Sequence, residues 1–242
     1  MNTRVRAVVR KELREFRRNK LVIVTMAALP MVFIAVPLAG VLAIKPGTDP
    51  GAIKAAVGSA LLGFFLVPLM LPTVIAGYSV VGEREQGTLE PVLTTPVRRE
   101  ELLVGKALAA IGPSTAMGYA LFALFLIVVQ LFARPAVVSL VRDPAVVVTI
   151  ALFTPLLAAF SIWVGMAISA RSSDVRVAQQ LSALAILPVV GVLWLFAFRV
   201  IAPTLAVAVE GAGLLAVLDL GAWKIVSAMF DRERLLTRYG GS

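Results

Sequence analysis

The chain has 242 residues, of which 60% are hydrophobic, with a mean hydropathy of +0.94 and a formal net charge of +9. This composition excludes an ordinary soluble domain and indicates an integral membrane protein. Cys and His are both absent, which excludes disulfides, thiol chemistry, imidazole catalysis and the usual zinc ligands, so no metal site is expected. The basic residues mostly flank apolar runs, as in membrane proteins, and do not indicate nucleic-acid binding.

Residues 1–20 are strongly basic, with eight Lys or Arg residues. Val5, Val9, Leu13 and Phe16 recur every three or four residues and form one apolar stripe. This pattern predicts an amphipathic helix on the membrane surface. The alternative is a charge cluster that only sets the orientation of the chain. No cleavable signal sequence is evident, so the first apolar run is expected to remain as a span.

Six apolar runs are long enough to cross about 30 Å of hydrocarbon at 1.5 Å per residue. They cover residues 21–44, 55–81, 104–132, 145–170, 180–198 and 204–230. The predicted fold is therefore an all-α, six-span integral membrane protein with a single transmembrane domain over residues 1–242. The outer loops are short, and residues 45–51 have the composition of a turn.

An even number of spans places both chain ends on the same side of the membrane. Segments 1–20, 82–106, 171–179 and 231–242 hold eight, four, two and three Lys or Arg residues, whereas the three opposite loops hold five. The positive-inside rule makes the first side cytoplasmic. We therefore expect a multi-pass protein of the cytoplasmic (inner) membrane, with both termini and a tail of residues 231–242 in the cytoplasm.

Proline recurs inside the predicted spans, where it removes a backbone hydrogen bond and bends the helix. These residues are Pro30, Pro37, Pro68, Pro72, Pro113, Pro155 and Pro188. Most are interpreted as packing kinks. The closely spaced Pro68 and Pro72 are the best candidates for a hinge.

The segment 82–106, GEREQGTLEPVLTTPVRREELLVGK, is the most polar long stretch of the chain. Thr88 is placed to cap a short helix with an apolar face of Leu89, Val92 and Leu93. Pro96 then begins the next helix, with Glu100 and Glu101 near its positive end. The segment is expected to be a short rigid connection between the second and third spans.

The string Glu-Arg-Glu-x-Gly-Thr-Leu-Glu, followed by Thr-Pro, an acidic pair and Gly-Lys, resembles the cytoplasmic coupling segment of ABC-2 superfamily permeases, the membrane halves of ABC exporters. Weaker similarities lie at residues 174–180 and 230–236, and the N-terminal helix resembles the elbow helix of that family. The resemblance implies docking on a separate ATPase subunit, which would bind ATP and Mg. It implies ATPase-coupling roles for Glu83, Arg84, Glu85, Gly87, Thr88, Leu89, Glu90, Val92, Leu93, Thr95 and Pro96.

The chain is not expected to be an enzyme itself. A phosphate-binding loop has the form GxxxxGK[ST], and Gly105-Lys106-Ala107 lacks both the upstream Gly and the hydroxyl. An intramembrane hydrolase is disfavoured because His is absent and Asp219 has no second intramembrane Asp partner. A passive channel or a membrane scaffold, such as a self-protection protein, is the alternative, but it does not require the coupling segment.

Asp219 lies well inside the sixth span, where a carboxylate costs about 2.5–3.5 kcal/mol and must face protein or water. A functional role and a purely structural, protonated or hydrogen-bonded role are both open. Glu210 is half a helical turn away in projection, so the two do not form a carboxylate pair. Glu210 is expected near the outer surface, facing Arg199.

Further polar residues are candidates for a translocation path or for interhelical hydrogen bonds. Gln179, Gln180 and Ser182 belong to the fifth span. The resemblance implies a path at a dimer interface bordered by the second and fifth spans, which adds Thr73 and Tyr78. We expect a permease subunit that forms a homodimer, or pairs with a similar permease, and exports a drug, lipid, peptide or ion.

Overall fold

The computed structural model describes residues 3–18, 20–77, 81–82, 98–197 and 204–229. All regular structure that it assigns in these residues is helical, which confirms the predicted all-α class. The helices are α1 (Thr3–Arg18), α2 (Lys20–Leu42), α3 (Pro50–Gly77), α6 (Arg99–Phe132), α7 (Pro135–Val141), α8 (Pro144–Ser169), α9 (Val175–Ala185), α10 (Leu187–Ala197) and α11 (Leu205–Met229).

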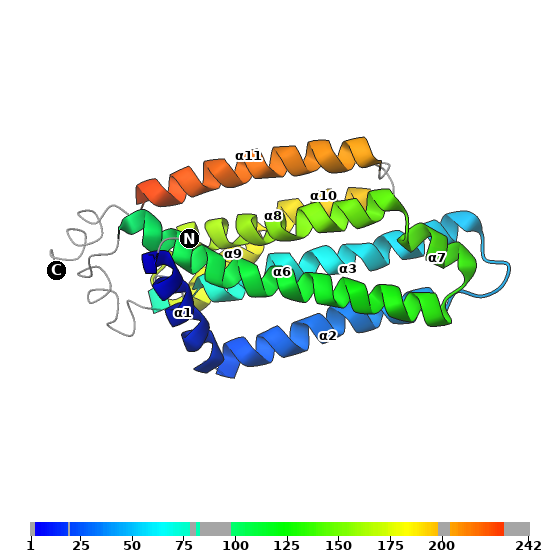
Figure 1. Ribbon diagram of the computed structural model, residues 1–242, viewed down its shortest axis with the longest axis horizontal. Helices are drawn as coiled ribbons and strands as arrows, with labels where there is room; N and C mark the ends of the chain where they lie inside the picture. Colours follow the sequence, from blue (N-terminus) through cyan, green and yellow to red (C-terminus); the bar gives the residue numbers. More distant parts are fainter. Residues whose placement is uncertain (1–2, 19, 78–80, 83–97, 198–203, 230–242) are drawn as a thin grey trace.

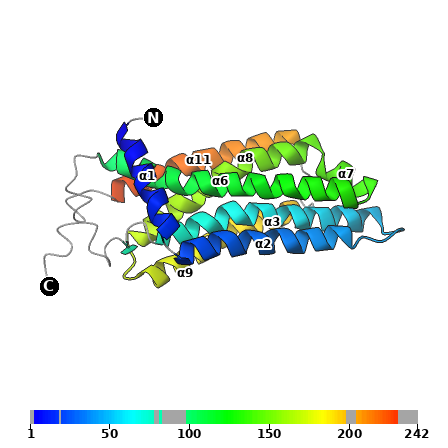
Figure 2. The same ribbon diagram turned by 60° about the horizontal axis from the view of Figure 1, so that its bottom comes forward.

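The long helices lie side by side along the longest axis of the molecule (Figure 1). Helix α1 crosses one end of this bundle, and the short α7 lies at the other; we name these the α1 end and the α7 end (Figure 2). Helix α3 occupies the centre and packs against α2, α6, α8, α9 and α10, whereas α11 lies at one edge on α8. The protein is therefore built around α3.

Five described helical segments are long and apolar enough to cross a membrane: Pro50–Ala76, Glu100–Phe132, Pro144–Ser169, Val175–Leu195 and Leu205–Met229. They match the second to sixth predicted spans. The first predicted span coincides with α2, a helix of 23 residues, of which the shorter segment Pro30–Leu42 is identified as apolar. The multi-pass membrane fold is thus confirmed, whereas the first predicted span, and with it the total of six, remains a prediction.

The fifth predicted span is not one continuous helix. It divides into α9 and α10 at Ile186, which lies directly before Leu187 and Pro188. Pro188 has no backbone N–H to donate to the carbonyl four residues earlier, so the helical hydrogen bonding is interrupted at this point. The other six prolines predicted to kink spans lie inside helices, and α3 is assigned as one helix through Pro68 and Pro72.

The predicted turn at residues 45–51 is confirmed for residues 45–49, with Gly47 at a positive φ of 82°, whereas Pro50 and Gly51 already belong to α3. The Asp49 carboxylate accepts from the Gly51 N–H at 2.8 Å and the Ala52 N–H at 3.2 Å. This cap satisfies donors of the first turn of α3 and starts the helix at Pro50, five residues before the predicted span. At the same end, Arg134 Nε donates to the Ile44 carbonyl at 3.1 Å. This hydrogen bond joins the loop between α2 and α3 to the loop between α6 and α7.

Candidate functional site

The predicted coupling residues, from Glu83 to Pro96, lie outside the described residues, as does Tyr78. What the structure describes are the two places where the chain enters and leaves this segment. Before it, the Val81 N–H donates to Ser169 Oγ at 3.2 Å, and Val81 packs with Val175 and Ala178 of α9. The entry is therefore held against the ends of α8 and α9 at the α1 end of the bundle.

After the segment, α6 begins at Arg99, three residues later than the predicted start at Pro96. The Arg98 backbone N–H donates to Glu101 Oε2 at 2.9 Å, and this contact fixes the first turn. Glu100 and Glu101 lie in that turn, as predicted from the helix dipole. Both ends of the segment are thus attached to helices of the central bundle.

Helix α1 packs across the beginning of α6 and contributes a buried ion pair to it. Lys106 Nζ lies 3.0 Å from Glu12 Oε1, and the two side chains are 3% and 6% exposed. Lys11 Nζ lies 3.4 Å from the same oxygen. Glu12 is separated from Lys106 by 94 residues of sequence. A pair buried this deeply is sensitive to the loss of either charge.

Two further contacts hold α1 on α6. A Cβ atom on Gly105 would lie 2.5 Å from Val8 Cγ1, so only glycine permits this approach. Arg4 Nη1 lies 3.6 Å from Glu101 Oε2 at the more exposed edge. We call this set of contacts, Val8 with Gly105, Glu12 with Lys106 and Arg4 with Glu101, the α1–α6 contact.

The predicted apolar stripe of α1 is only partly buried in the helix bundle. Val5 is buried and Phe16 packs on the apolar cluster between α6 and α8, but Val9 and Leu13 are only half-buried. The buried face is turned toward Val8 and Glu12 because α1 packs on α6, where Lys106 provides a partner for the Glu12 carboxylate. Hydrophobic periodicity alone does not find this pair.

Three of the predicted path residues come together where α3 packs against α8 and α9. Thr73 Oγ1 lies 2.7 Å from both Ser161 Oγ and the Leu69 carbonyl, and the Ser161 hydroxyl donates to the same carbonyl. Gln179 Nε2 donates to the Val74 carbonyl at 3.5 Å, and Ser182 Oγ to the Ala178 carbonyl at 2.7 Å. Gln180 is exposed on the surface of α9.

These hydroxyl and amide groups donate hydrogen bonds to backbone carbonyls of their own or a neighbouring helix. We call this group, Thr73, Ser161, Gln179 and Ser182, the polar seam. The second and fifth predicted spans therefore contact each other, and Gln179 donates across this contact to Val74, whereas the Thr73–Ser161 pair joins the second span to the fourth.

Asp219 lies apart from the polar seam, on the opposite face of α8. It belongs to α11, which packs on α8 and only slightly on α6 (Figure 1). Asp219 is 8% exposed, and its two carboxylate oxygens are buried with no hydrogen-bond partner among the described residues. Among the described residues, Thr115 Oγ1 on α6 is also buried without a hydrogen-bond partner. Glu210 is exposed, and Arg199 lies outside the described residues.

A family model described as "ABC-2 family transporter protein" matches residues 6–223, from α1 into α11. The chain belongs to the ABC-2 transporter family. A search of the curated proteins finds no match. Apart from Arg4, the residues of the α1–α6 contact lie within the matched part of this ABC-2 protein, as do Asp219 and both sides of the predicted coupling segment.

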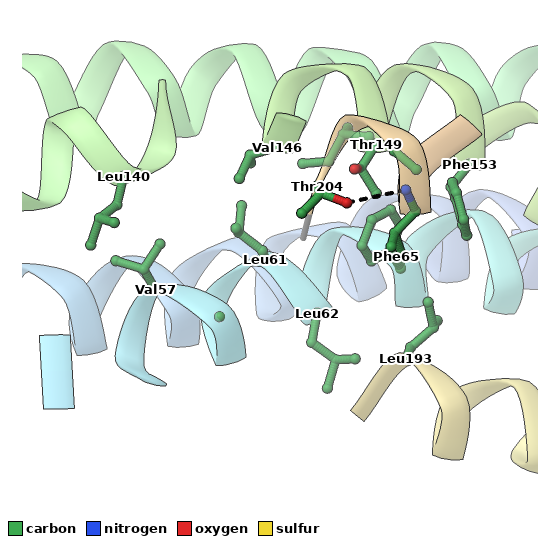
Figure 3. Close-up of a pocket in the computed structure, with 14 residues that line it drawn as sticks. Val57, Leu61, Leu62, Phe65, Leu140, Val146, Thr149, Phe153, Leu193 and Thr204 are labelled. Atoms are coloured by element: carbon green, nitrogen blue, oxygen red, sulfur yellow. Dashed lines mark hydrogen bonds between the residues drawn. The ribbon is translucent and has the colours of Figure 1, made fainter. Parts of the chain in front are cut away.

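This ABC-2 protein also has an apolar cavity of about 70 Å³ near the α7 end, which the sequence does not reveal. Figure 3 shows side chains of α3, α8, α10 and α11 around it, among them Val57, Phe65, Phe153 and Leu193. Its polar groups are used locally: Thr149 Oγ1 donates to the Ala145 carbonyl, and Thr204 Oγ1 accepts from the Val207 N–H at 3.2 Å. The cavity therefore presents mainly hydrocarbon.

Proposed function

We propose that this chain is the permease subunit of an ABC exporter, driven by ATP hydrolysis on a separate nucleotide-binding subunit. Family membership supports a transporter membrane subunit. The attachment of both sides of the coupling segment to the bundle supports the proposed coupling mechanism. Since α3 precedes the segment and α6 follows it, a displacement of residues 83–94 by an ATPase reaches the central helix directly.

The α1–α6 contact extends this path of movement. Because α1 is attached to α6 by a buried ion pair and by the close approach of Val8 to Gly105, the two helices move together. Helix α1 is also followed almost immediately by α2. In the proposed mechanism, a movement of the coupling segment therefore displaces α3, α6, α1 and the start of α2 as connected parts.

The proposed membrane topology has six spans, with α2 as the first. Its 23 residues reach about 34 Å at 1.5 Å per residue, which is sufficient for the hydrocarbon core. The α1 end is then cytoplasmic, and α1 lies at the membrane surface with its exposed arginines near lipid head groups. We propose that two permease subunits, identical or similar, form the complete membrane part with the contact between α3 and α9 beside the translocation path.

The test is co-purification from mild detergent after expression with the neighbouring genes, followed by an ATPase assay. We expect a stoichiometric ATPase whose hydrolysis is no longer linked to transport in the Glu85→Lys variant, because the reversed charge removes a docking contact. Glu210→Lys is the matched control, since Glu210 is an exposed acid outside the coupling segment. A lone oligomer without nucleotide hydrolysis, or normal coupling in Glu85→Lys, would contradict the proposal.

A further inference from the structure

The face that α11 presents to α8 follows a regular spacing of four and three residues. Ala208, Ala212, Leu215, Asp219 and Val226 are buried, and Ala222, which completes the spacing, is half-buried. This is the spacing of residues along the contact line of two packed helices. Asp219 is the one member of this line with an ionisable side chain, so its carboxyl group lies in the helix contact itself.

Aromatic side chains close the α8–α11 contact on both sides of Asp219. Toward the α7 end, a Cβ atom on Gly211 would lie 2.9 Å from Phe153 Cζ, so the ring fills the space beside this glycine. Toward the α1 end, Trp163 and Trp223 pack edge to face with ring centroids 5.0 Å apart. Trp223 is one helical turn beyond Asp219. The carboxyl group therefore lies between two tightly packed aromatic contacts, Phe153 with Gly211 and Trp163 with Trp223.

Among the described residues of α6, α8 and α11, no cation is placed to balance a negative charge at Asp219. Helix α8 contains no Asp, Glu, Lys or Arg. In α6 the charged residues are Arg99, Glu100, Glu101 and Lys106, all in the first turns at the α1 end. On α11 itself, Glu210 and Lys224 are exposed.

These observations decide which form of the carboxyl group fits the site. An ionised carboxylate that is shielded from water and accepts no hydrogen bond from the described residues is strongly disfavoured at membrane depth, whereas a neutral acid is tolerated. The carboxyl group then takes up one proton from water and returns it to water, with no other reactant. Such an exchange requires that the helix contact open.

We propose that Asp219 is a proton-binding site within the membrane, which holds its proton while α8 and α11 are packed and exchanges it when the Trp163–Trp223 contact opens. This goes beyond the proposed function and requires only that α8 and α11 span the membrane. It therefore stands or fails independently of the ATPase partner. The proton route runs toward the α1 end, because the exposed Lys224 lies five residues beyond Asp219 on that side, whereas residues 211–218 on the other side carry no polar side chain.

The test is infrared spectroscopy of the purified protein in lipid, which detects the carbonyl stretch of a protonated carboxylic acid. At neutral pH we expect this band in the wild type and in Glu210→Gln, the matched control on the same helix, and its loss in Asp219→Asn. Asp219→Glu, which keeps an acid in the contact, should retain a band. Absence of the band in the wild type, or its persistence in Asp219→Asn, would overturn the proposal.

The route is tested by the rate at which the same band shifts after transfer to D₂O. Trp223→Ala should speed this exchange about two- to tenfold, because it removes one aromatic pair that closes the site. Phe153→Ala, on the other side of Asp219, should leave the rate unchanged. Faster exchange in Phe153→Ala but not in Trp223→Ala would instead place the route toward the α7 end and overturn the proposed opening.

Discussion

Glu12 and Asp219 are two acids buried to nearly the same extent, 5% and 8% exposed, in opposite chemical surroundings. Glu12 lies in the α1–α6 contact and has the Lys106 ammonium 3.0 Å away. Asp219 lies in the α8–α11 contact among apolar side chains, without a partner among the described residues. Burial therefore does not by itself determine whether a carboxyl group is charged; the partner does.

The same chemical change, from acid to amide, should reduce stability far more at Glu12 than at Asp219. Glu12→Gln removes the negative charge beside the buried Lys106 ammonium and should destabilise the protein by about 3–5 kcal/mol. The measurement is the fraction of protein that remains monodisperse after heating in detergent. Arg4→Ala is the control, since Arg4 is half-exposed and its pair with Glu101 should contribute about 0–1 kcal/mol.

The double variant Glu12→Leu with Lys106→Met sharpens this prediction. It replaces the ion pair by apolar groups of similar volume, which is often neutral at buried sites. We expect it to recover most of the stability that Glu12→Gln loses. If the double variant is as unstable as Glu12→Gln, the stability lost in Glu12→Gln does not arise from the Lys106 charge that remains beside residue 12.

Gly105→Ala tests the close packing of the α1–α6 contact without changing any charge. The added Cβ would lie 2.5 Å from Val8 Cγ1, so α1 must shift, and we expect a loss of about 1–3 kcal/mol. Combining it with Val8→Ala should recover only part of the loss, because the Cβ atom that alanine keeps at position 8 would still lie 2.6 Å from the added Cβ. Gly112→Ala, further along α6, is the matched control, because a Cβ atom added there would have nothing within 4 Å. Equal heat stability of Gly105→Ala and Gly112→Ala would contradict the prediction.

Asp219→Asn should have the smallest effect on stability, less than about 1.5 kcal/mol, because a neutral amide replaces a neutral acid of the same shape. The same heating assay checks it, alongside Asp219→Leu as a wholly apolar variant. A loss as large as that of Glu12→Gln would show that Asp219 is ionised in the folded protein and balanced by a group outside the described residues.

Helix positions could be predicted from sequence because membrane-spanning helices need long apolar runs whose location does not depend on neighbours. The start of α3 at Pro50 and the break at Ile186 were missed, since they depend on the Asp49 cap and on Pro188 at the start of a new helix. The position of Asp219 deep in its span could also be predicted, because long apolar stretches lie on both sides of it in the sequence.

Partners across the bundle could not be predicted in this way. Glu12 resembles the other charged residues of a basic amphipathic helix. Lys106 was considered as a cytoplasmic basic residue, as part of the Gly-Lys pair of the family resemblance and as part of an incomplete phosphate-binding motif. Nothing in periodicity relates two residues 94 positions apart. Thr73, Gln179 and Ser182 were predicted as candidates for a translocation path, Thr73 on the basis of the family resemblance. The packing of α3 against α9 brings them together, and their role in a path stays a prediction.

The separation of Glu12 from Lys106 also has a consequence for biosynthesis. At 5–20 residues per second, Lys106 is made on the order of 5–20 s after Glu12. During this interval α1 is complete, but the Glu12 carboxylate has no Lys106 ammonium beside it and is more stable in water than in a helix contact. The α1–α6 contact therefore forms only after the chain has passed through α2 and α3, and its formation marks the point at which the first part of the bundle is assembled.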